Sequence, residues 1–454
     1  MSADDLHRIA ASLDAEQICD EVDWWRATIA IDKLLRRTRG SRRAAQAATD
    51  AAKAVQEAAG RAGIPLPDAE VTRVARAAAD VARGLAAGSP ARPVVGLLLG
   101  PGPSNPYPEA TTALTRPMLG HLDPEFLALL DETMDRLRAV FRTDHALTFP
   151  VSGTGSAGME ACFVNLLEPG DTAIVGVNGV FGERMCEVAR RCGATVVRVE
   201  APWGRTLDAD ALLAAQEAQP DARLLAVVHA ETSTGVENDV APLGALRETD
   251  TLLVVDAVTS LGGIPVEVDS WGIDACYAGT QKCLGVAPGL APLTLSERAR
   301  ARVRARSSPP QSWYLDVGLL ERYVAGAQRA YHHTAPVSMI LSLHAGLGAI
   351  LDEGLDAVWA RHRRVGARLQ HELPRLGFRL LAEEGHRLPQ LTSAWLPDGV
   401  DDATLRKELL ETYGIEVGAG LGEFSGRAWR IGLLGHAARD RTVTTLLGAL
   451  RDLL

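Results

Sequence analysis

The sequence has few cysteines, few aromatic residues and no long hydrophobic run. Its six cysteines form no CxxC pair and no zinc-type spacing, which excludes a disulfide scaffold and favours reduced thiols in a cytoplasmic protein. No apolar run is long enough to cross a bilayer, and the opening residues, MSADDLHRIAASLDAEQ, are too acidic for a signal or transit peptide. We therefore expect no membrane partner.

Excess positive charge is also missing. The 47 Lys and Arg residues are outnumbered by 57 Asp and Glu residues, which gives a net charge of −10 and argues against a wholly basic nucleic-acid-binding protein. Hydrophobic residues make up 47% and charged residues 23% of the chain, a globular composition that excludes global disorder. The length of 454 residues predicts about two or three domains.

The first 92 residues differ in composition from the rest. Residues 1–90 contain 24 alanines and equal numbers of basic and acidic residues, 13 of each. Alanine has the highest helix propensity, so we expect an all-α extension over residues 1–92. A basic cluster at residues 33–43 has acids on both sides, which favours a solvated helix end over a nucleic-acid site. An oligomerisation arm, a docking module for another protein and a stabilising cap all remain open as the role of this extension.

From residue 94 onward, short apolar runs alternate with helical stretches. PEFLALLDETMDRLRAVF (124–141) has the spacing of an amphipathic helix, and six β-rich runs follow it: ALTFPV, TAIVGV, TVVRVE, RLLAVVHA, TLLVVDA and ACYAG. This alternation predicts an α/β fold over residues 93–340, with a mainly parallel sheet covered by helices on both faces. The runs LTSAWLP and AWRIGLLG lie between helical stretches and predict a small C-terminal α+β domain over 341–454.

A glycine-rich turn, Val151-Ser-Gly-Thr-Gly-Ser-Ala-Gly158, lies between a β-rich run and a helical stretch. Glycines let a ligand approach the backbone closely, and the N-terminus of the helix offers N–H donors and a positive dipole, so the pattern suits a phosphate. Its spacing fits neither GxGxxG nor a P-loop, which excludes both of those nucleotide sites. Taken alone, the turn is equally consistent with a structural role.

Two charged residues follow later β-rich runs. Asp256 ends TLLVVD, and Lys282 comes 26 residues later, just after ACYAG. An acid at the carboxyl end of a buried strand lies where open α/β sheets bind ligands, although many such aspartates are helix caps. A phosphate cradle, an acid and a lysine in this order are what pyridoxal 5'-phosphate (PLP) needs. The lysine forms a Schiff base with the aldehyde, and the acid pairs with the pyridine nitrogen.

With these residues in place, the chain resembles the class V aminotransferases of PLP fold type I, in the alanine–glyoxylate and serine–pyruvate aminotransferase branch. The resemblance runs from about Leu97 to the C-terminus. It is carried by blocks in family order that include LLLGPGPSNP, SGTGSAGMEAC, GVNGVFGERM, HAETSTGV, VVDAVTSLGG, GTQKCLGVAPG, YHHTAPV and WRIGLLG. It implies a large PLP-binding domain followed by a small C-terminal domain.

The resemblance also implies roles for the residues around the cofactor ring. Lys282 would form the Schiff base and move the proton between Cα and C4′. Asp256 would pair with the pyridine nitrogen. Val258 would pack on one face of the ring and Phe181 would stack on the other, although a core role for Phe181 remains open.

The phosphate and the substrate would be held by further residues of the matching blocks. The cofactor-binding positions that remain are Thr154, Gly155, Ser156, Thr232 and Gln281. Tyr331 and Thr334 would reach the phosphate in the neighbouring subunit, so the family implies a homodimer with shared active sites. Arg430 would bind the substrate carboxylate through a bidentate fork, with Ser104 and Asn105 beside the substrate. We expect no metal, since the adjacent His332 and His333 lack the spacing of a helical metal pair.

The activity implied by the resemblance is PLP-dependent transamination between a small L-amino acid, alanine or serine, and a small 2-oxo acid, glyoxylate or pyruvate. Related desulfurases have a histidine just before the lysine, where this chain has Gln281, and this favours transamination. One alternative is a PLP lyase, a decarboxylase or a pathway-specific transaminase acting on a different amine. Another is a PLP-sensing regulator whose N-terminal segment binds nucleic acid, which the neutral charge of that segment disfavours.

Overall fold

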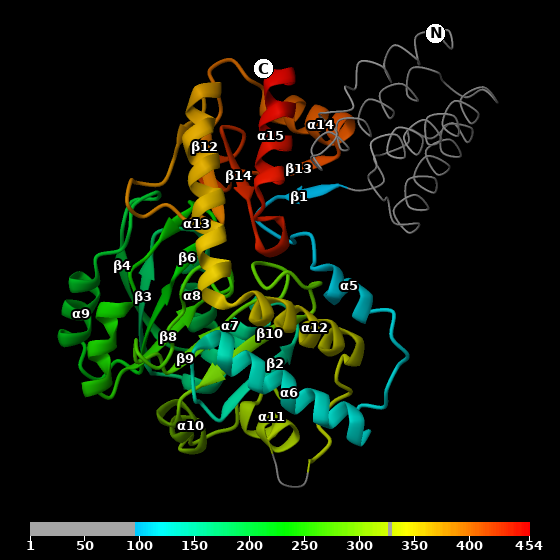
Figure 1. Cartoon of the computed structure of the whole chain (residues 1–454). Helices are drawn as coiled ribbons and strands as arrows, with labels where there is room; N and C mark the ends of the chain where they lie inside the picture. The colour runs from blue at the N-terminus through cyan, green and yellow to red at the C-terminus, as the bar shows by residue number, and fades with distance from the viewer. Residues whose placement is uncertain (1–95, 326–328) are drawn as a thin grey trace, which may run out of the picture. The chain divides into compact units, whose positions relative to one another are not determined.

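The computed structural model describes residues 96–325 and 329–454 (Figure 1). The predicted helical extension over residues 1–92 lies outside the described residues. The chain divides into two compact units. The larger comprises Leu98–Asp402 and Val417–Arg439, and the other includes Ala403–Glu416 and Asp440–Leu454. No helix in the described ranges is long and apolar enough to cross a membrane.

A seven-stranded sheet forms the centre of the larger unit. Its order is β2-β10-β9-β8-β5-β3-β4, and the strands are β2 (Leu147–Ser152), β3 (Thr172–Val177), β4 (Thr195–Glu200), β5 (Leu224–Val228), β8 (Leu252–Asp256), β9 (Ala275–Tyr277) and β10 (Leu290–Leu295). Only β10 runs antiparallel to its neighbours β2 and β9; the pairs among β4, β3, β5, β8 and β9 are parallel. The prediction of a mainly parallel sheet is confirmed.

Helices pack against this sheet. α6 (Pro124–Phe141) has the predicted bounds, because Asp123 accepts a hydrogen bond from the Glu125 N–H and caps its N-terminus. α7 (Gly155–Leu166), α8 (Val180–Arg191), α9 (Ala209–Glu217) and α10 (Glu297–Arg304) each contact strands of the sheet. α12 (Val337–Glu353) lies along α6 and α5 (Pro108–Ala113) (Figure 1). The helices α11 (Val317–Val324) and α13 (Leu355–Glu372) flank α12 in sequence.

A second sheet has the order β1-β13-β14-β12-β11. Its strands are β1 (Leu97–Leu99), β13 (Ile415–Ala419), β14 (Ala428–Gly432), β12 (Leu391–Trp395) and β11 (Arg379–Leu380). β12 and β14 were predicted from sequence and pair with each other in antiparallel register. The short β6 (Ala230–Glu231) and β7 (Val236–Glu237) form a separate hairpin, and α14 (Asp402–Tyr413) and α15 (Asp440–Leu453) complete the chain. The domain boundary predicted at residue 340 falls inside α12 and stays a prediction.

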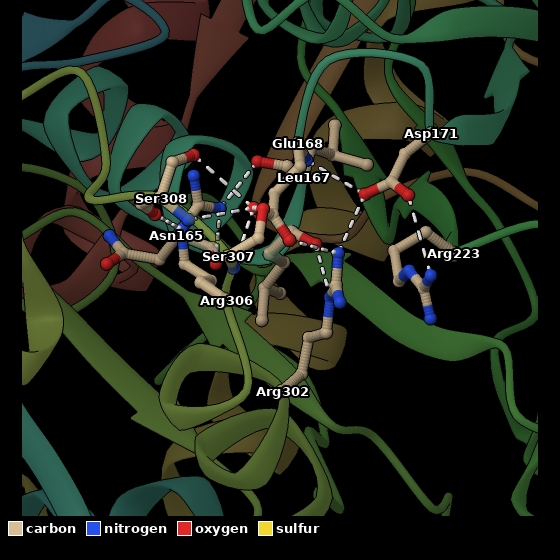
Figure 2. Close-up of polar contacts among 10 residues, drawn as sticks. Asn165, Leu167, Glu168, Asp171, Arg223, Arg302, Arg306, Ser307 and Ser308 are labelled. Atoms are coloured by element: carbon tan, nitrogen blue, oxygen red, sulfur yellow. Dashed lines mark hydrogen bonds and ion pairs between the residues drawn. The ribbon is translucent and has the colours of Figure 1, made fainter.

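The carboxyl end of α7 is fixed by arginines from the segment that contains α10 (Figure 2). Arg306 donates to the carbonyl oxygens of Asn165 and Leu167 at 3.0 and 2.6 Å. Arg302 donates to the Leu166 oxygen at 3.4 Å. Cationic donors at this end of a helix satisfy carbonyl groups that have no partner inside the helix and favour its dipole.

Glu168, just beyond α7, binds Arg302 and the loop at Ser307 and Ser308 that follows α10 (Figure 2). One carboxylate oxygen accepts from the Ser307 N–H and hydroxyl at 3.0 and 2.7 Å, and from the Ser308 N–H at 3.3 Å. The other oxygen pairs with Arg302 at 3.1 Å, and Arg302 also reaches Asp171 at 2.9 Å. The hydrogen bond from the Ser307 hydroxyl is the main reason that the pKa of Glu168 falls to about 2.

Substitution of Glu168 should weaken this end of α7. Glu168→Gln removes a charged acceptor of several hydrogen bonds, so the free energy of unfolding should fall by about 1–3 kcal/mol at pH 7. Because the folded pKa lies below the ordinary value, this contribution is present above pH ~4.5 and is lost as the pH falls toward ~2. Urea unfolding at pH 7 and pH 3 checks this: the gap between wild type and variant should narrow at pH 3. A gap that widens at pH 3 would contradict the account.

Candidate functional site

The carboxyl ends of five parallel strands meet along one edge of the seven-stranded sheet. Asp256 ends β8 and lies in register with Val228 of β5 and Tyr277 of β9. The glycine turn at 153–155 follows β2, Phe181 lies just after β3, Thr232 just after β5, and Lys282 just after β9. The topology therefore brings the predicted residues of the large domain to the edge where open α/β sheets bind ligands.

Lys282 is half-buried against the segment at residues 100–103. Its ammonium donates to the Pro101 carbonyl oxygen. At Gly102 the backbone φ is +117°, and a Cβ there would lie 2.7 Å from Nζ of Lys282, so only glycine allows this approach. Burial, helped by the charge of Arg430, lowers the pKa of Lys282 to about 8. Near neutral pH this amine is closer to releasing its proton than a lysine in water.

Asp256 is buried, with 3% of its surface exposed. One carboxylate oxygen accepts from the Val258 N–H at 2.8 Å and the other from the Tyr277 hydroxyl at 3.0 Å. Burial raises the pKa of Asp256 to about 6, although these two hydrogen bonds and the charge of Lys282 oppose the rise. Asp256 is therefore mostly ionised at pH 7 and presents a negative charge in a desolvated place.

The glycine turn leads into α7 with its N-terminus uncapped by any side chain of the described residues. A Cβ at Gly155 would lie 2.7 Å from Cγ2 of Val258, so glycine lets the first turn of α7 lie against the loop after Asp256. Thr154 and Ser156, on either side, are exposed. Open N–H groups at a helix N-terminus, with a positive dipole, make this an anion-binding place.

Phe181 lies in the first turn of α8 and is half-buried. The guanidinium carbon of Arg184 lies 4.8 Å from the centre of the Phe181 ring, a cation–π arrangement. Arg184 also donates to the Ser156 hydroxyl at 3.4 Å. The charge of Arg184 lowers the pKa of both Asp256 and Lys282, so this arginine belongs to the electrostatics of the site.

Arg430 extends from β14 and is 9% exposed. Its Nε donates to the Ala419 carbonyl oxygen at 2.8 Å. Burial lowers the pKa of Arg430 to about 10, and the charge of Glu231 opposes this. The charge of the Arg430 guanidinium in turn helps to lower the pKa of Lys282.

The other predicted residues differ in their contacts and burial. The Ser104 hydroxyl donates to the Lys282 carbonyl oxygen at 2.9 Å, and Asn105 Oδ1 accepts from the Leu98 N–H at 2.8 Å. These two contacts go to the backbone, and contact of Ser104 and Asn105 with substrate stays a prediction. Thr232 is buried, and Oε1 of Gln281 is buried with no hydrogen-bond partner among the described residues.

Tyr331 and Thr334 are exposed. Neither makes a hydrogen bond or ring contact with the residues around Lys282 within the described ranges; the ring of Tyr331 lies 5.5 Å from that of His121. The neighbouring histidines take structural contacts, since His332 stacks on Trp313 at 4.2 Å and His333 bonds to the Ser152 hydroxyl at 2.8 Å.

Three residues near the site were not singled out from the sequence: Glu231, Tyr277 and Arg184. Glu231 and Tyr277 stand in the quoted runs, as the acid two residues after His229 in HAETSTGV and as the tyrosine of ACYAG. Pairing of Tyr277 with Asp256 depends on the register of β8 and β9, which local sequence does not give. Arg184 lies one helical turn after Phe181, and this spacing was the available signal.

Comparison with known proteins supports one family. The family model described as Aminotransferase class-V matches residues 105–425. An (S)-ureidoglycine–glyoxylate transaminase of Bacillus subtilis is 35% identical over 79% of this chain and 90% of its own length. An alanine–glyoxylate aminotransferase of Callithrix jacchus is 39% identical over 79% of this chain and 87% of its own.

A solved structure is similar in the same way. The crystal structure of an alanine–glyoxylate aminotransferase from Nostoc sp. superposes with a TM-score of 0.77 at 44% identity, covering 80% of this chain and 97% of that one. The match therefore extends over almost the whole of the known enzyme.

The lowered pKa of Lys282 is directly measurable. Lys282 is one of four lysines in the sequence, so competitive acetylation followed by peptide mass spectrometry can follow it alone in PLP-free protein. We expect reactivity to rise with a midpoint near pH 8, below the ordinary 10.5. Arg430→Met should move the midpoint upward, because the cation that disfavours the ammonium is removed. Exposed Lys407 serves as the internal check on the reagent; a Lys282 midpoint above 10 would overturn the assignment.

Proposed function

Because the chain belongs to the class V aminotransferases, we propose that it moves the amino group of a small L-amino acid, such as alanine or serine, to glyoxylate or pyruvate. The family identity confirms three predictions made from the sequence: the fold is that of PLP fold type I, the chain is a PLP-dependent aminotransferase, and its cofactor is pyridoxal 5'-phosphate. The choice of donor and acceptor, and the residue roles below, are the proposal.

The observation that carries the proposal is the shared strand edge that holds Lys282, Asp256 and the open N-terminus of α7. The residues fit PLP. An anion finds unfilled N–H groups at the start of α7, which no side chain of the described residues caps. Asp256 provides a desolvated negative charge for the pyridine nitrogen.

We assign the cofactor's contacts accordingly. The phosphate is held by the α7 turn and the segments beside it, through Thr154, Gly155, Ser156, Thr232 and Gln281. Val258 and Phe181 cover the two faces of the ring. PLP, when bound, supplies an electron sink that stabilises negative charge at the substrate's Cα.

Lys282 performs the proton transfer. An amine with a pKa of about 8 both holds and releases a proton near neutral pH, which is the property that general acid–base catalysis requires. Its contact with the Pro101 carbonyl and the close approach of Gly102 limit where the amine can move. Asp256 stays ionised and keeps the pyridine end of the site negative.

Arg430 binds the substrate carboxylate. Its guanidinium is buried and fixed at Nε by the Ala419 carbonyl, which leaves the two terminal nitrogens as a preoriented fork for a carboxylate. One such fork suits monocarboxylates. Glyoxylate is named in the activity of each of the three relatives described above, and this supports glyoxylate as the acceptor. Alanine and serine are small and carry a single carboxylate, so they fit as donors at this one fork.

We propose that the active enzyme is a homodimer with shared sites. Tyr331 is 61% exposed although it is aromatic, and Met118, Trp313 and Tyr314 are 71%, 60% and 42% exposed. Large apolar side chains on a surface are typical of an interface. A second copy that covers them would receive Tyr331 and Thr334 beside its own cofactor phosphate.

Two further parts of the proposal concern the cellular compartment and the N-terminal extension. The five cysteines of the described ranges are all free and buried, which supports a reduced compartment such as the cytoplasm. The family match begins at residue 105, so we propose that residues 1–92 dock another protein rather than take part in catalysis.

The absorbance of the purified enzyme tests the activity. It should show the visible band of lysine-bound PLP, release PLP on denaturation, and change its band when L-alanine is added. Lys282→Ala should lack the band, whereas the matched Lys407→Ala should keep it. A donor panel of alanine, serine and (S)-ureidoglycine against glyoxylate, pyruvate and 2-oxoglutarate then identifies the substrates. Protein with no PLP would refute the proposal, and a preference for ureidoglycine or 2-oxoglutarate would refute the substrate assignment.

Subunit mixing tests the shared site. Lys282→Ala and Tyr331→Ala impair different halves of one site, so each homodimer has two defective sites. Exchange of subunits creates heterodimers with one intact site, and a 1:1 mixture should recover up to about a quarter of wild-type activity. The measurement is the rate of 2-oxo acid formation after exchange. A mixture whose activity equals the mean of the two variants would show that each chain completes its own site.

A further inference from the structure

Glu231 is a buried carboxylate for which the catalytic scheme has no role. It follows β5 and has no exposed surface. Burial raises the pKa of Glu231 to about 7, and the negative charge of Asp256 adds to the rise. Burial of a carboxylate costs free energy unless strong hydrogen bonds compensate for the lost water. Among the described residues, the donors to Glu231 come from two short segments.

Those donors are the first N–H groups of α8 and the residue Ser233. Oε2 of Glu231 accepts from the Phe181 N–H at 3.2 Å and from the Gly182 N–H at 3.4 Å. Oε1 accepts from the Ser233 N–H at 3.1 Å and its hydroxyl at 2.5 Å. The Ser233 oxygen in turn accepts from the Val180 N–H at 3.0 Å. Glu231 and Ser233 together satisfy the N–H groups of the first three residues of α8.

The local sequence leaves this task to Glu231. The residue at the cap position of α8 is Gly179, which has no side chain to cap the helix. Nor would a side chain fit, since a Cβ on Gly179 would collide with Glu231 and with the Ser233 hydroxyl. The Glu231 carboxylate, which comes from a different strand, therefore takes the place of a normal helix cap and binds the backbone N–H of Phe181.

The N-termini of α7 and α8 contrast in the same site. α7 has no cap from any side chain that the structure describes and stays open for an anion, whereas the N-terminus of α8 is filled by a carboxylate of the chain itself. A helix N-terminus that already holds Glu231 does not compete for the phosphate. What α8 contributes instead is the aromatic ring carried by its second residue.

We propose that Glu231 is a positioning residue, which fixes the first turn of α8 and thereby holds the Phe181 ring against the face of the bound PLP. This rests on the proposed function, because it assigns Phe181 to the cofactor ring. Glu231 touches neither cofactor nor substrate in this scheme and acts through the Phe181 and Gly182 N–H groups.

Glu231→Gln is the direct variant. It keeps length and volume but turns one acceptor oxygen into an NH₂ group, which must then face N–H or O–H donors. Glu168→Gln is the matched control: Glu168 also accepts from backbone N–H groups and a serine hydroxyl at a helix end, but it lies outside the site. Both variants should unfold at lower temperature, because both lose a buried or half-buried acceptor.

The readouts that separate a positioning role from a structural one concern PLP. In Glu231→Gln the dissociation constant for PLP should rise about tenfold, the equivalent of about 1.4 kcal/mol, and the circular dichroism band of bound PLP should change. Glu168→Gln should leave both at their wild-type values. In a double-mutant cycle, Glu231→Gln should add nothing to the effect of Phe181→Leu on PLP affinity, since Glu231 acts through that ring.

Each other outcome is decisive. If Glu231→Gln loses thermal stability but binds PLP with wild-type affinity and dichroism, or if the two substitutions add fully, the proposal is wrong. If Glu231→Gln does not fold, Ser233→Ala, which removes the acceptor of the Val180 N–H, should shift the dichroism and PLP affinity in the same direction. A wild-type protein that binds no PLP would instead refute the proposed function, independently of Glu231.

Discussion

The partly desolvated ammonium of Lys282 is the feature on which the rest of the site depends. Burial and the nearby charge of Arg430 lower its pKa to about 8, and a lysine in this state is suited to attack an aldehyde and to transfer a proton. The surroundings are arranged to tolerate it. The Pro101 carbonyl accepts from the ammonium, Gly102 allows the close approach, and the Ser104 hydroxyl holds the Lys282 carbonyl. Asp256 supplies the opposite charge, itself kept ionised by Tyr277 and the Val258 N–H.

Two helices that begin at the same edge of the sheet divide the remaining work. α7 begins without a side-chain cap from the described residues and presents open N–H groups, while Arg302 and Arg306 bind carbonyl groups at its far end. α8 is closed at its N-terminus by Glu231 and presents Phe181. The N-terminus of one helix thus offers an anion site and that of the other offers an aromatic ring. The two helix ends differ in that a carboxylate of the chain fills the N-terminus of α8 and leaves that of α7 open.

Much of the secondary structure was predictable from the sequence, wherever a single local pattern determines a helix or strand. The apolar spacing of residues 124–141 gave α6, and the runs ALTFPV and TLLVVDA located β2 and β8. β10 was missed because Pro292 interrupts its run LAPLTL, and proline is normally confined to edge strands. β13 was missed because IEVGA is short and mixes a charge and glycine with its apolar residues.

The site residues divide in the same way. Asp256 ends a strand and Lys282 and the glycine turn follow strands, so the arrangement of the sheet alone brings their positions together. Glu231 and Tyr277 act through side-chain contacts with segments 50 and 21 residues away in sequence, and no local pattern specifies those partners. The most direct test of the account is borohydride reduction of the purified enzyme, followed by mass spectrometry of its peptides. The account predicts one phosphopyridoxyl group, on the peptide that contains Lys282; a group on Lys407, or none on any lysine, would contradict it.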